Sequence, residues 1–173
     1  MALPLAYLLT FTCYGSHLHG DERGSVDREH NHVGSRGVNP YRAWVNASRS
    51  IMTDECYRLD EDCRRIVLAS MRQVCEYRQW DLIAAHVRTT HVHAVVSAGT
   101  TPEVVLHDFK AYATRSLNKF EHSRRRWTRH GSTRYLWTRS DVDAAADYVV
   151  RRQGEPMEVY CGSDPRSMTV AAP

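Results

Sequence analysis

Residues 80–97, WDLIAAHVRTTHVHAVVS, decide the fold that the sequence predicts. Two short apolar runs, 80–87 and 91–97, lie on either side of the polar residues 88–90. This pattern fits a β-hairpin better than a helix interrupted in its middle, because a polar turn between short apolar runs is typical of paired strands. The sequence therefore predicts two neighbouring antiparallel strands at its centre.

Further elements are predicted on both sides of the hairpin. Residues 5–13 form a short run rich in β-branched and aromatic residues, which indicates a buried strand. Residues 60–79 and about 102–118 have apolar residues at helical spacing, and Asp60 supplies an N-cap signal for the first of these helices. Residues 14–40 are rich in glycine and polar residues without a sustained period, and they are predicted to be a long loop.

The C-terminal third is predicted to hold a strand and a helix. After a basic connector at 124–134, residues 135–137 are expected to form a short strand. Residues 141–153 have acidic residues in the first turn, alanines inside, arginines in the last turn and Gly154 just beyond, which together mark the start and the end of a helix. Residues 158–173 are expected to be a C-terminal tail.

Together these elements predict an α+β fold, a two-layer sandwich in which an antiparallel sheet has helices on one face. The length of 173 residues suits one domain, and 42% hydrophobic with 25% charged residues excludes the disordered and fibrous classes. No apolar stretch approaches the roughly 20 residues that cross a bilayer, so a cytoplasmic protein without membrane contact is expected. The five cysteines include no CxxC pair, which argues against a disulfide framework or a zinc ribbon.

Charge is unevenly distributed along the chain. Between Lys110 and Arg152 there are eleven basic and four acidic residues, whereas the remainder is net acidic. Arginine clusters attract phosphates by charge and by forked hydrogen bonds, so this asymmetry points to a polyanion as partner. A merely solvated face is the alternative interpretation.

Histidines form three His-x-His triplets, at 17–19, 30–32 and 91–93. Alternate side chains of a strand share a face, so His91 and His93 can hold one metal ion between them. The first two triplets lie in the predicted loop, where nothing in the pattern fixes two rings on one side. Surface histidines without a metal are the alternative interpretation of the third triplet.

Tyr148 lies in the middle of the predicted helix 141–153. Viewed alone, a tyrosine there would most often fill the core. Arg151 and Arg152 follow on neighbouring helical positions, where they can hold a phosphate beside a phenolic nucleophile, and Gln153 has a side-chain oxygen able to reach a metal. A phenol attacks phosphate poorly by itself, but a divalent ion on the histidine pair can polarise the phosphate. A metal and a tyrosine together form a coherent phosphoryl-transfer site.

Four segments resemble the single-tyrosine HUH transposases, the family of insertion-sequence and REP-associated tyrosine transposases. They are HVHAVV at 91–96, the apolar strand before it, LLTFTCYG at 8–15 and DYVVRRQGEPM at 147–157. The resemblance identifies residues 1–157 as an HUH single-stranded DNA transposase or endonuclease domain. It implies a ferredoxin-like fold.

The resemblance also implies a chemistry and the residues that perform it. His91 and His93 would bind a magnesium or manganese ion, with Gln153 as a third ligand. Tyr148 would attack single-stranded or hairpin DNA, forming a 5′-phosphotyrosine intermediate and freeing a 3′-hydroxyl for strand transfer. Some relatives act as dimers that exchange their tyrosine helices, so the resemblance leaves open a monomer, with Tyr148 acting in cis, and a homodimer, with Tyr148 acting in trans. The residues expected to bind DNA are Lys110, Arg115, Arg124, Arg125, Arg126, Arg151 and Arg152, with Trp127 or Trp137 available to stack on bases.

The sequence departs from the family pattern at Gln153 and carries a second candidate tyrosine, Tyr112. Many relatives carry Asn or Gln four residues after the tyrosine, whereas here that position is Arg152 and the glutamine, Gln153, comes one residue later. Five residues rotate a regular helix by about 140° from Tyr148, so Gln153 can assist only if the helix end loosens or the tyrosine approaches from another angle. Tyr112 is a rival tyrosine, but it is in register with apolar residues of the helix 102–118 and is expected to be core.

Two other functions fit the same sequence. A DNA-hairpin-binding protein of transposase origin would use the same charge without cleaving its ligand. A histidine-liganded metal hydrolase would use activated water, and it would need further ligands such as His17, His19 and Asp21. The hydrolase would leave no covalent protein adduct, which separates it from a tyrosine transposase.

Overall fold

The computed structural model describes residues 3–16 and 42–162 of the chain. The histidine triplets at 17–19 and 30–32, together with Asp21, lie outside these ranges, and so does most of the predicted loop. Within the described ranges, no helix is long and apolar enough to cross a membrane.

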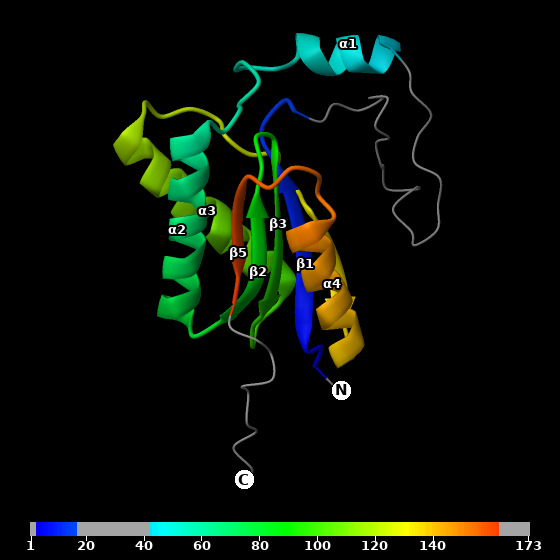
Figure 1. Cartoon of the computed structure of the whole chain (residues 1–173). Helices are drawn as coiled ribbons and strands as arrows, with labels where there is room; N and C mark the ends of the chain where they lie inside the picture. The colour runs from blue at the N-terminus through cyan, green and yellow to red at the C-terminus, as the bar shows by residue number, and fades with distance from the viewer. Residues whose placement is uncertain (1–2, 17–41, 163–173) are drawn as a thin grey trace.

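The fold is built on a five-stranded antiparallel sheet with the strand order β4-β1-β3-β2-β5 (Figure 1). The strands are β1 (Ala6–Thr12), β2 (Asp81–Val87), β3 (His91–Ser97), β4 (Ser132–Leu136) and β5 (Glu158–Cys161). The helices are α1 (Arg42–Ser50), α2 (Glu61–Arg78), α3 (Pro102–Phe120) and α4 (Arg139–Arg151). The predicted α+β class is confirmed, and the succession β1-α2-β2-β3-α3-β4 has the ferredoxin-like arrangement.

The predicted hairpin of β2 and β3 is confirmed, with His86 opposite His93 in the register. On its other side β3 pairs with β1, where Thr10 lies opposite His93 and Thr12 lies opposite His91. Because β3 is bonded to a neighbouring strand on each side, its side chains project from the most constrained part of the sheet.

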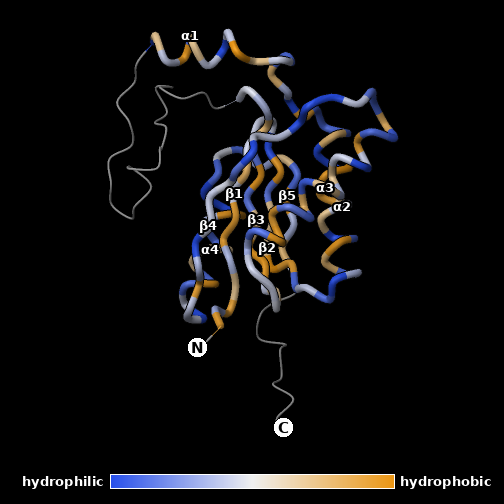
Figure 2. Tube along the Cα trace, turned by 180° about the vertical axis from the view of Figure 1, so that it is seen from behind, coloured by the Kyte–Doolittle hydropathy of each residue, from blue (hydrophilic) through white to orange (hydrophobic). Residues whose placement is uncertain are grey.

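Helices α2 and α3 cover one face of the sheet and enclose the larger hydrophobic core. Tyr7, Leu9 and Phe11 alternate along β1 toward this core, where they meet Phe109 and Leu117 of α3. Burying each large apolar side chain contributes roughly 1.5–3 kcal/mol. Figure 2 shows the hydrophobic residues concentrated along the central strands and on the inner sides of these helices.

Helix α4 departs from the expectation that the helices share one face, since it packs on the opposite side of the sheet (Figure 1). A smaller core there joins Ala84 of β2 and Val95 of β3 to Val142, Ala145 and Val149 of α4. The cause is that the central strands are apolar on both faces, so each face requires a cover. Consequently α4 lies over the face from which the odd-numbered residues of β3 project.

The ends of α4 are defined by local signals. Thr138 caps the N-terminus, where its hydroxyl accepts from the Asp141 N–H and the Asp141 carboxylate accepts from the Thr138 N–H, a reciprocal arrangement typically worth about 0.5–2 kcal/mol. This capping box starts the helix two residues before the predicted Asp141. The last turn ends at Arg151, and Gly154 has a φ of 76°, a left-handed conformation that glycine adopts easily.

Two elements were not predicted from the sequence. Residues 158–173 were expected to be a tail, but the first four, Glu158–Cys161, form β5 and pair with the outer edge of β2, which corrects that boundary. Tyr160 of β5 packs against the main core, which fixes the strand there. Helix α1 is the second such element, and none of its described side chains is buried.

Candidate active site

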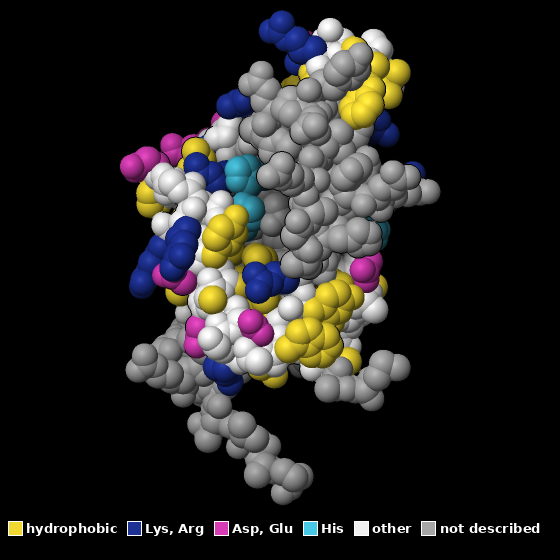
Figure 3. Space-filling view, turned by 90° about the vertical axis from the view of Figure 1, so that its right-hand side faces the viewer, with side chains coloured by type: hydrophobic (Ala, Val, Ile, Leu, Met, Phe, Trp, Pro, Cys, Tyr) yellow, Lys and Arg dark blue, Asp and Glu magenta, His cyan; other side chains and the backbone are white. Residues whose placement is uncertain are grey.

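His91 and His93 project side by side from β3 on the α4 face of the sheet. Their ring centroids are 4.9 Å apart and their planes are inclined by 76°. His91 is half-buried, whereas His93 is only 7% exposed. The two rings share a face, as strand alternation predicts, and histidine side chains are visible on this side of the molecule beside hydrophobic and basic ones (Figure 3).

Thr10 on the neighbouring strand fixes the orientation of His93. Its Oγ1 lies 2.7 Å from His93 Nδ1, in a hydrogen bond whose direction depends on the tautomer. Burial, with smaller contributions from His91 and His86, lowers the pKa of His93 to about 4. The ring is therefore neutral at pH 7, which is the form that binds a metal ion.

Tyr148 of α4 lies beside the histidine pair. Its ring centroid is 5.8 Å from that of His93, and the planes are inclined by 73°. The side chain is 42% exposed, while its neighbour Val149 and Ala145 one turn earlier fill the core beneath α4. The interpretation of Tyr148 as a core residue therefore does not fit its position, and the phenol is accessible to a large ligand.

Gln153 folds back toward the same place because α4 ends at Arg151. Its Nε2 donates to the backbone oxygen of Tyr148 at 3.2 Å, and its side chain also hydrogen-bonds His93, which by itself would raise the pKa of that ring. The condition set by the sequence, that the helix end loosens, is met. The structure thus brings His91, His93, Tyr148 and Gln153 together.

Arg151 and Arg152 are both turned toward Asp147. Arg152 Nε lies 2.8 Å and Arg151 Nη1 lies 3.4 Å from the two carboxylate oxygens. The Arg151 side chain is 80% exposed and the Arg152 side chain is 72% exposed. Such surface pairs typically contribute only about 0–1 kcal/mol, so a phosphate can replace the carboxylate at little cost.

The donor atoms at this site fit a divalent ion with open coordination positions. In the described ranges, no group of three or more His, Cys, Asp or Glu side chains is placed to hold a metal. The two imidazoles and the Gln153 amide would leave several positions for phosphate oxygens and water. Open positions are typical of catalytic rather than structural metal sites.

Two solved transposase structures have a similar fold. One is a REP-associated tyrosine transposase bound to a REP hairpin, with a TM-score of 0.49 and 9% identity over 86% of this chain and 66% of that one. The chain thus spans slightly less than two thirds of that structure's length. The other is a putative transposase from Deinococcus radiodurans R1, with a TM-score of 0.44 and 11% identity over 83% of this chain and 88% of that one.

No protein-family model and no curated protein sequence matches the chain. Both similar structures are described as transposases.

His86 is a site residue that the sequence analysis did not single out. It is fully buried on β2, where its Nε2 accepts from the Met157 N–H at 3.1 Å. Nδ1 therefore carries the proton and donates to the Val149 backbone oxygen, also at 3.1 Å. Burial lowers the pKa of this ring, in keeping with a neutral state. One imidazole thus ties the last turn of α4, next to Tyr148, to the segment that leads into β5.

Replacing His86 by leucine is expected to lower the free energy of unfolding by about 2–5 kcal/mol. The change leaves the Val149 oxygen and the Met157 N–H without their partner, and each such buried loss costs roughly 1–3 kcal/mol. Urea denaturation followed by circular dichroism measures the effect. His107→Leu is the matched control, because that side chain is 79% exposed, and its unfolding midpoint should hardly change. Equal midpoints for His86→Leu and wild type would contradict the role of His86.

Arg88 is a second residue that the sequence did not reveal. Its Nη1 donates to the Glu155 backbone oxygen at 3.0 Å, and its charge contributes to lowering the pKa of His93. It follows β2 directly, in the hairpin turn. Arg88 therefore supplies a guanidinium close to the histidine pair.

Two of the expected DNA-binding residues are used inside the fold. Arg126 is 2% exposed, pairs with Glu121 at 3.3 Å and stacks over Tyr57. Lys110 donates to the backbone oxygens of Thr128 at 2.8 Å and His130 at 3.0 Å, and burial lowers its pKa to about 8. Both charges stabilise the segment before β4, so neither is available to contact DNA.

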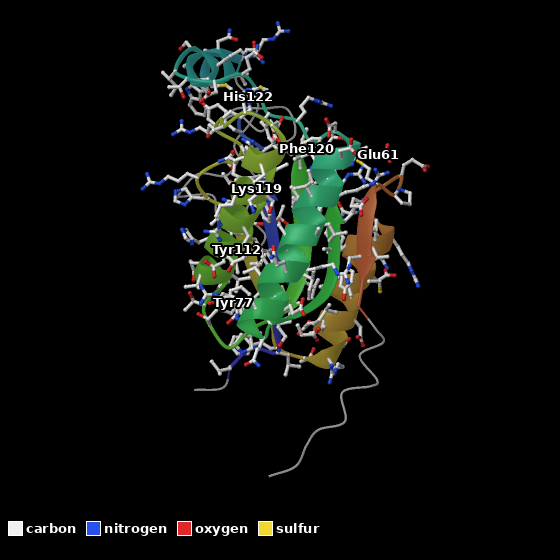
Figure 4. The ribbon with its side chains drawn as sticks, turned by 90° about the vertical axis from the view of Figure 1, so that its left-hand side faces the viewer. Glu61, Tyr77, Tyr112, Lys119, Phe120 and His122 are labelled. Carbon is white, nitrogen blue, oxygen red and sulfur yellow. The ribbon has the colours of Figure 1, made fainter. Side chains whose placement is uncertain are left out.

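Three more of the expected DNA contacts, Arg115, Arg124 and Arg125, lie away from Tyr148. Arg115 is exposed on α3, where it stacks over Tyr112 at 4.3 Å. Arg124 and Arg125 follow α3 and stack over Tyr57 and Tyr14. Figure 4 shows Tyr112 on the side covered by α2 and α3, so this rival tyrosine is separated from the histidine pair by the sheet.

Proposed function

We propose that the protein is a metal-dependent single-stranded DNA endonuclease and strand transferase, a transposase in its chemistry, with Tyr148 as the nucleophile. The observation that supports it most is the convergence of three elements on one place. Strand β3 contributes His91 and His93, helix α4 contributes the accessible Tyr148, and the turn after α4 contributes Gln153.

In the proposed reaction the Tyr148 oxygen attacks the phosphorus of a DNA phosphodiester. A bond forms between phosphorus and the phenolic oxygen, and the bond from phosphorus to the 3′-oxygen breaks. The phenol proton passes to solvent, and the departing 3′-oxygen takes up a proton to become a hydroxyl. The 3′-hydroxyl of another strand end can then attack the 5′-phosphotyrosine, so one phosphoester replaces another and no external energy is required.

His91, His93 and Gln153 would hold the magnesium or manganese ion. When bound, such an ion supplies polarisation of the phosphate and partial neutralisation of its charge. Arg151 and Arg152 would exchange Asp147 for a phosphate oxygen, and Arg88 would add positive charge near the histidines.

The proposed partner is single-stranded or hairpin DNA. Beyond the site, the exposed Arg115 and Arg125 and the partly exposed Arg124 would bind its backbone, a contribution that falls with salt. The family resemblance leaves a monomer and a homodimer open.

The decisive experiment uses hairpin oligonucleotides with single-stranded flanks, labelled at either end and incubated with the protein and Mn²⁺ or Mg²⁺. A 5′-phosphotyrosine predicts that a 3′ label becomes linked to protein on a denaturing gel, while a 5′ label appears in a free, shortened strand. Cleavage without any linked label would indicate a water-using hydrolase. Binding without cleavage in both ions would indicate a hairpin-binding protein, and either result would refute the proposal.

Thr10→Val is expected to reduce adduct formation at limiting Mn²⁺ by about 10- to 100-fold, the usual effect of losing a residue that orients a metal ligand. The change keeps the shape of the side chain but removes the oxygen 2.7 Å from His93 Nδ1. The measurement is the adduct rate as a function of Mn²⁺ concentration. Thr12→Val is the matched control, because the Thr12 hydroxyl bonds Thr128 instead. Equal Mn²⁺ dependence in the two variants would exclude the role given to Thr10.

A further inference from the structure

Two exposed aromatic side chains stand at the end of the edge strand β4. Tyr135 is 46% exposed, and Trp137, just beyond the strand, is 54% exposed. Their rings are nearly parallel, with planes inclined by 14° and centroids 6.1 Å apart. Large aromatic surface is seldom left in water without a use, and here two rings present it together.

The pair is anchored to the core. The Tyr135 ring meets the ring of Tyr7 edge to face, with centroids 5.4 Å apart. Tyr7 is only 4% exposed, and its hydroxyl donates to the Thr100 backbone oxygen at 2.9 Å. Three rings therefore run from the interior to the surface, and the outer two lose little conformational freedom when a ligand binds.

The segment that holds the pair is rich in arginine, and Asp141, whose carboxylate caps α4, is the first acidic residue after it. Residues 122–140 contain six arginines and no aspartate or glutamate. Two of these arginines, Arg134 and Arg139, are exposed and flank Tyr135 and Trp137 in the chain. Because β4 pairs only with β1, the pair lies at a sheet edge that no other described strand covers (Figure 2).

Trp127, the other tryptophan considered for base stacking, is occupied within the fold. Its Nε1 donates to Thr114 Oγ1 at 3.0 Å, and its ring contacts Phe11 edge to face with centroids 5.1 Å apart. It packs against the main core. Of the two candidates, Trp137 is therefore the one available to a ligand.

We propose that Tyr135 and Trp137 form a stacking platform for an unpaired base of single-stranded DNA. Every base has an apolar π-face, so an aromatic ring beside basic side chains binds single strands with little sequence preference. Arg134 and Arg139 would hold the phosphates next to the stacked base. The inference rests on the proposed function for its substrate class. It adds a second site that binds the DNA strand, away from the site of cleavage.

The test is the affinity for a fluorescein-labelled oligothymidine of about 15 nucleotides, measured by anisotropy in EDTA. Trp137→Leu and Tyr135→Leu are each expected to weaken binding by about 5- to 100-fold, which corresponds to the loss of one base stack. Trp137→Phe keeps a ring and should stay within about threefold of wild type. Tyr77→Leu removes a tyrosine that is 72% exposed on α2 and should change nothing.

Several outcomes would overturn the platform. One is equal oligothymidine affinity in wild type, Trp137→Leu and Tyr135→Leu. Another is an equal loss in Trp137→Leu and Trp137→Phe, which would show that the ring face is not what binds. Self-association that disappears in Trp137→Leu while DNA binding persists would assign the edge to a second copy of the chain.

Binding in EDTA reports on the platform whether or not cleavage occurs. An absent protein adduct together with Trp137-dependent binding would refute the nuclease and keep the platform. An adduct together with Trp137-independent binding would refute the platform and keep the nuclease.

Discussion

Tyr148→Phe is expected to eliminate the protein-linked DNA product while DNA affinity stays within about threefold of wild type. The substitution removes one oxygen and leaves the ring in its contact with His93. A covalent pathway has no substitute for its nucleophile, so the adduct rate should fall by at least about 10³-fold. Single-turnover reactions with 3′-labelled hairpin oligonucleotides measure the rate, and anisotropy measures the affinity.

Tyr112→Phe is the matched control for this prediction. Tyr112 is partly buried on α3, beneath the Arg115 guanidinium and on the other face of the sheet. Its variant should form the adduct at the wild-type rate. Unchanged adduct formation in Tyr148→Phe would rule out Tyr148 as the nucleophile. Loss of the adduct in Tyr112→Phe alone would transfer that role to α3.

The histidine pair is the part of the site that the sequence predicts best. Strand alternation is a local property, so the triplet His-Val-His places two rings on one face wherever the strand lies. The polar turn at 88–90 identifies the strand. No knowledge of the rest of the fold is needed for that step.

The face that α4 covers could not be predicted in the same way. The motif HVHAVV shows that β3 is apolar beyond its histidines, which is compatible with a helix on either face. The choice is made by pairings distant in sequence, such as Val95 with Val149 and His86 with both Val149 and Met157. These contacts also hold the turn in which Gln153 folds back.

Charge counting fails at single residues for a related reason. Arg124, Arg125 and Arg126 look alike in the sequence, but only Arg126 is enclosed, between Glu121 and the Tyr57 ring. Strand β5 could not be predicted either, because four residues are too few to show an alternating hydrophobic pattern. The segment forms a strand because it pairs with the open edge of β2. Both cases depend on a contact with another part of the chain, which the local sequence does not reveal.

The double variant His91→Ala, His93→Ala is expected to lose both Mn²⁺ binding at the site and Mn²⁺-dependent adduct formation. The two imidazoles are the principal donors present, and the ion they would hold supplies several kcal/mol of charge stabilisation. That amount corresponds to a fall in adduct rate of about 10³-fold. Electron paramagnetic resonance of bound Mn²⁺ gives a readout that does not depend on cleavage.

His107→Ala is the control for the double variant, because this exposed histidine lies on α3, away from the pair, and its loss should change neither Mn²⁺ binding nor the adduct rate. Circular dichroism establishes that the double variant is folded, since His93 is nearly buried and its removal leaves a space. Tyr148→Phe should bind Mn²⁺ as wild type does, because the phenol is no ligand in the proposed site. If Mn²⁺ binding and adduct formation both survive in a folded double variant, the ion binds elsewhere. The histidine pair beside Tyr148 would then have no role in metal binding.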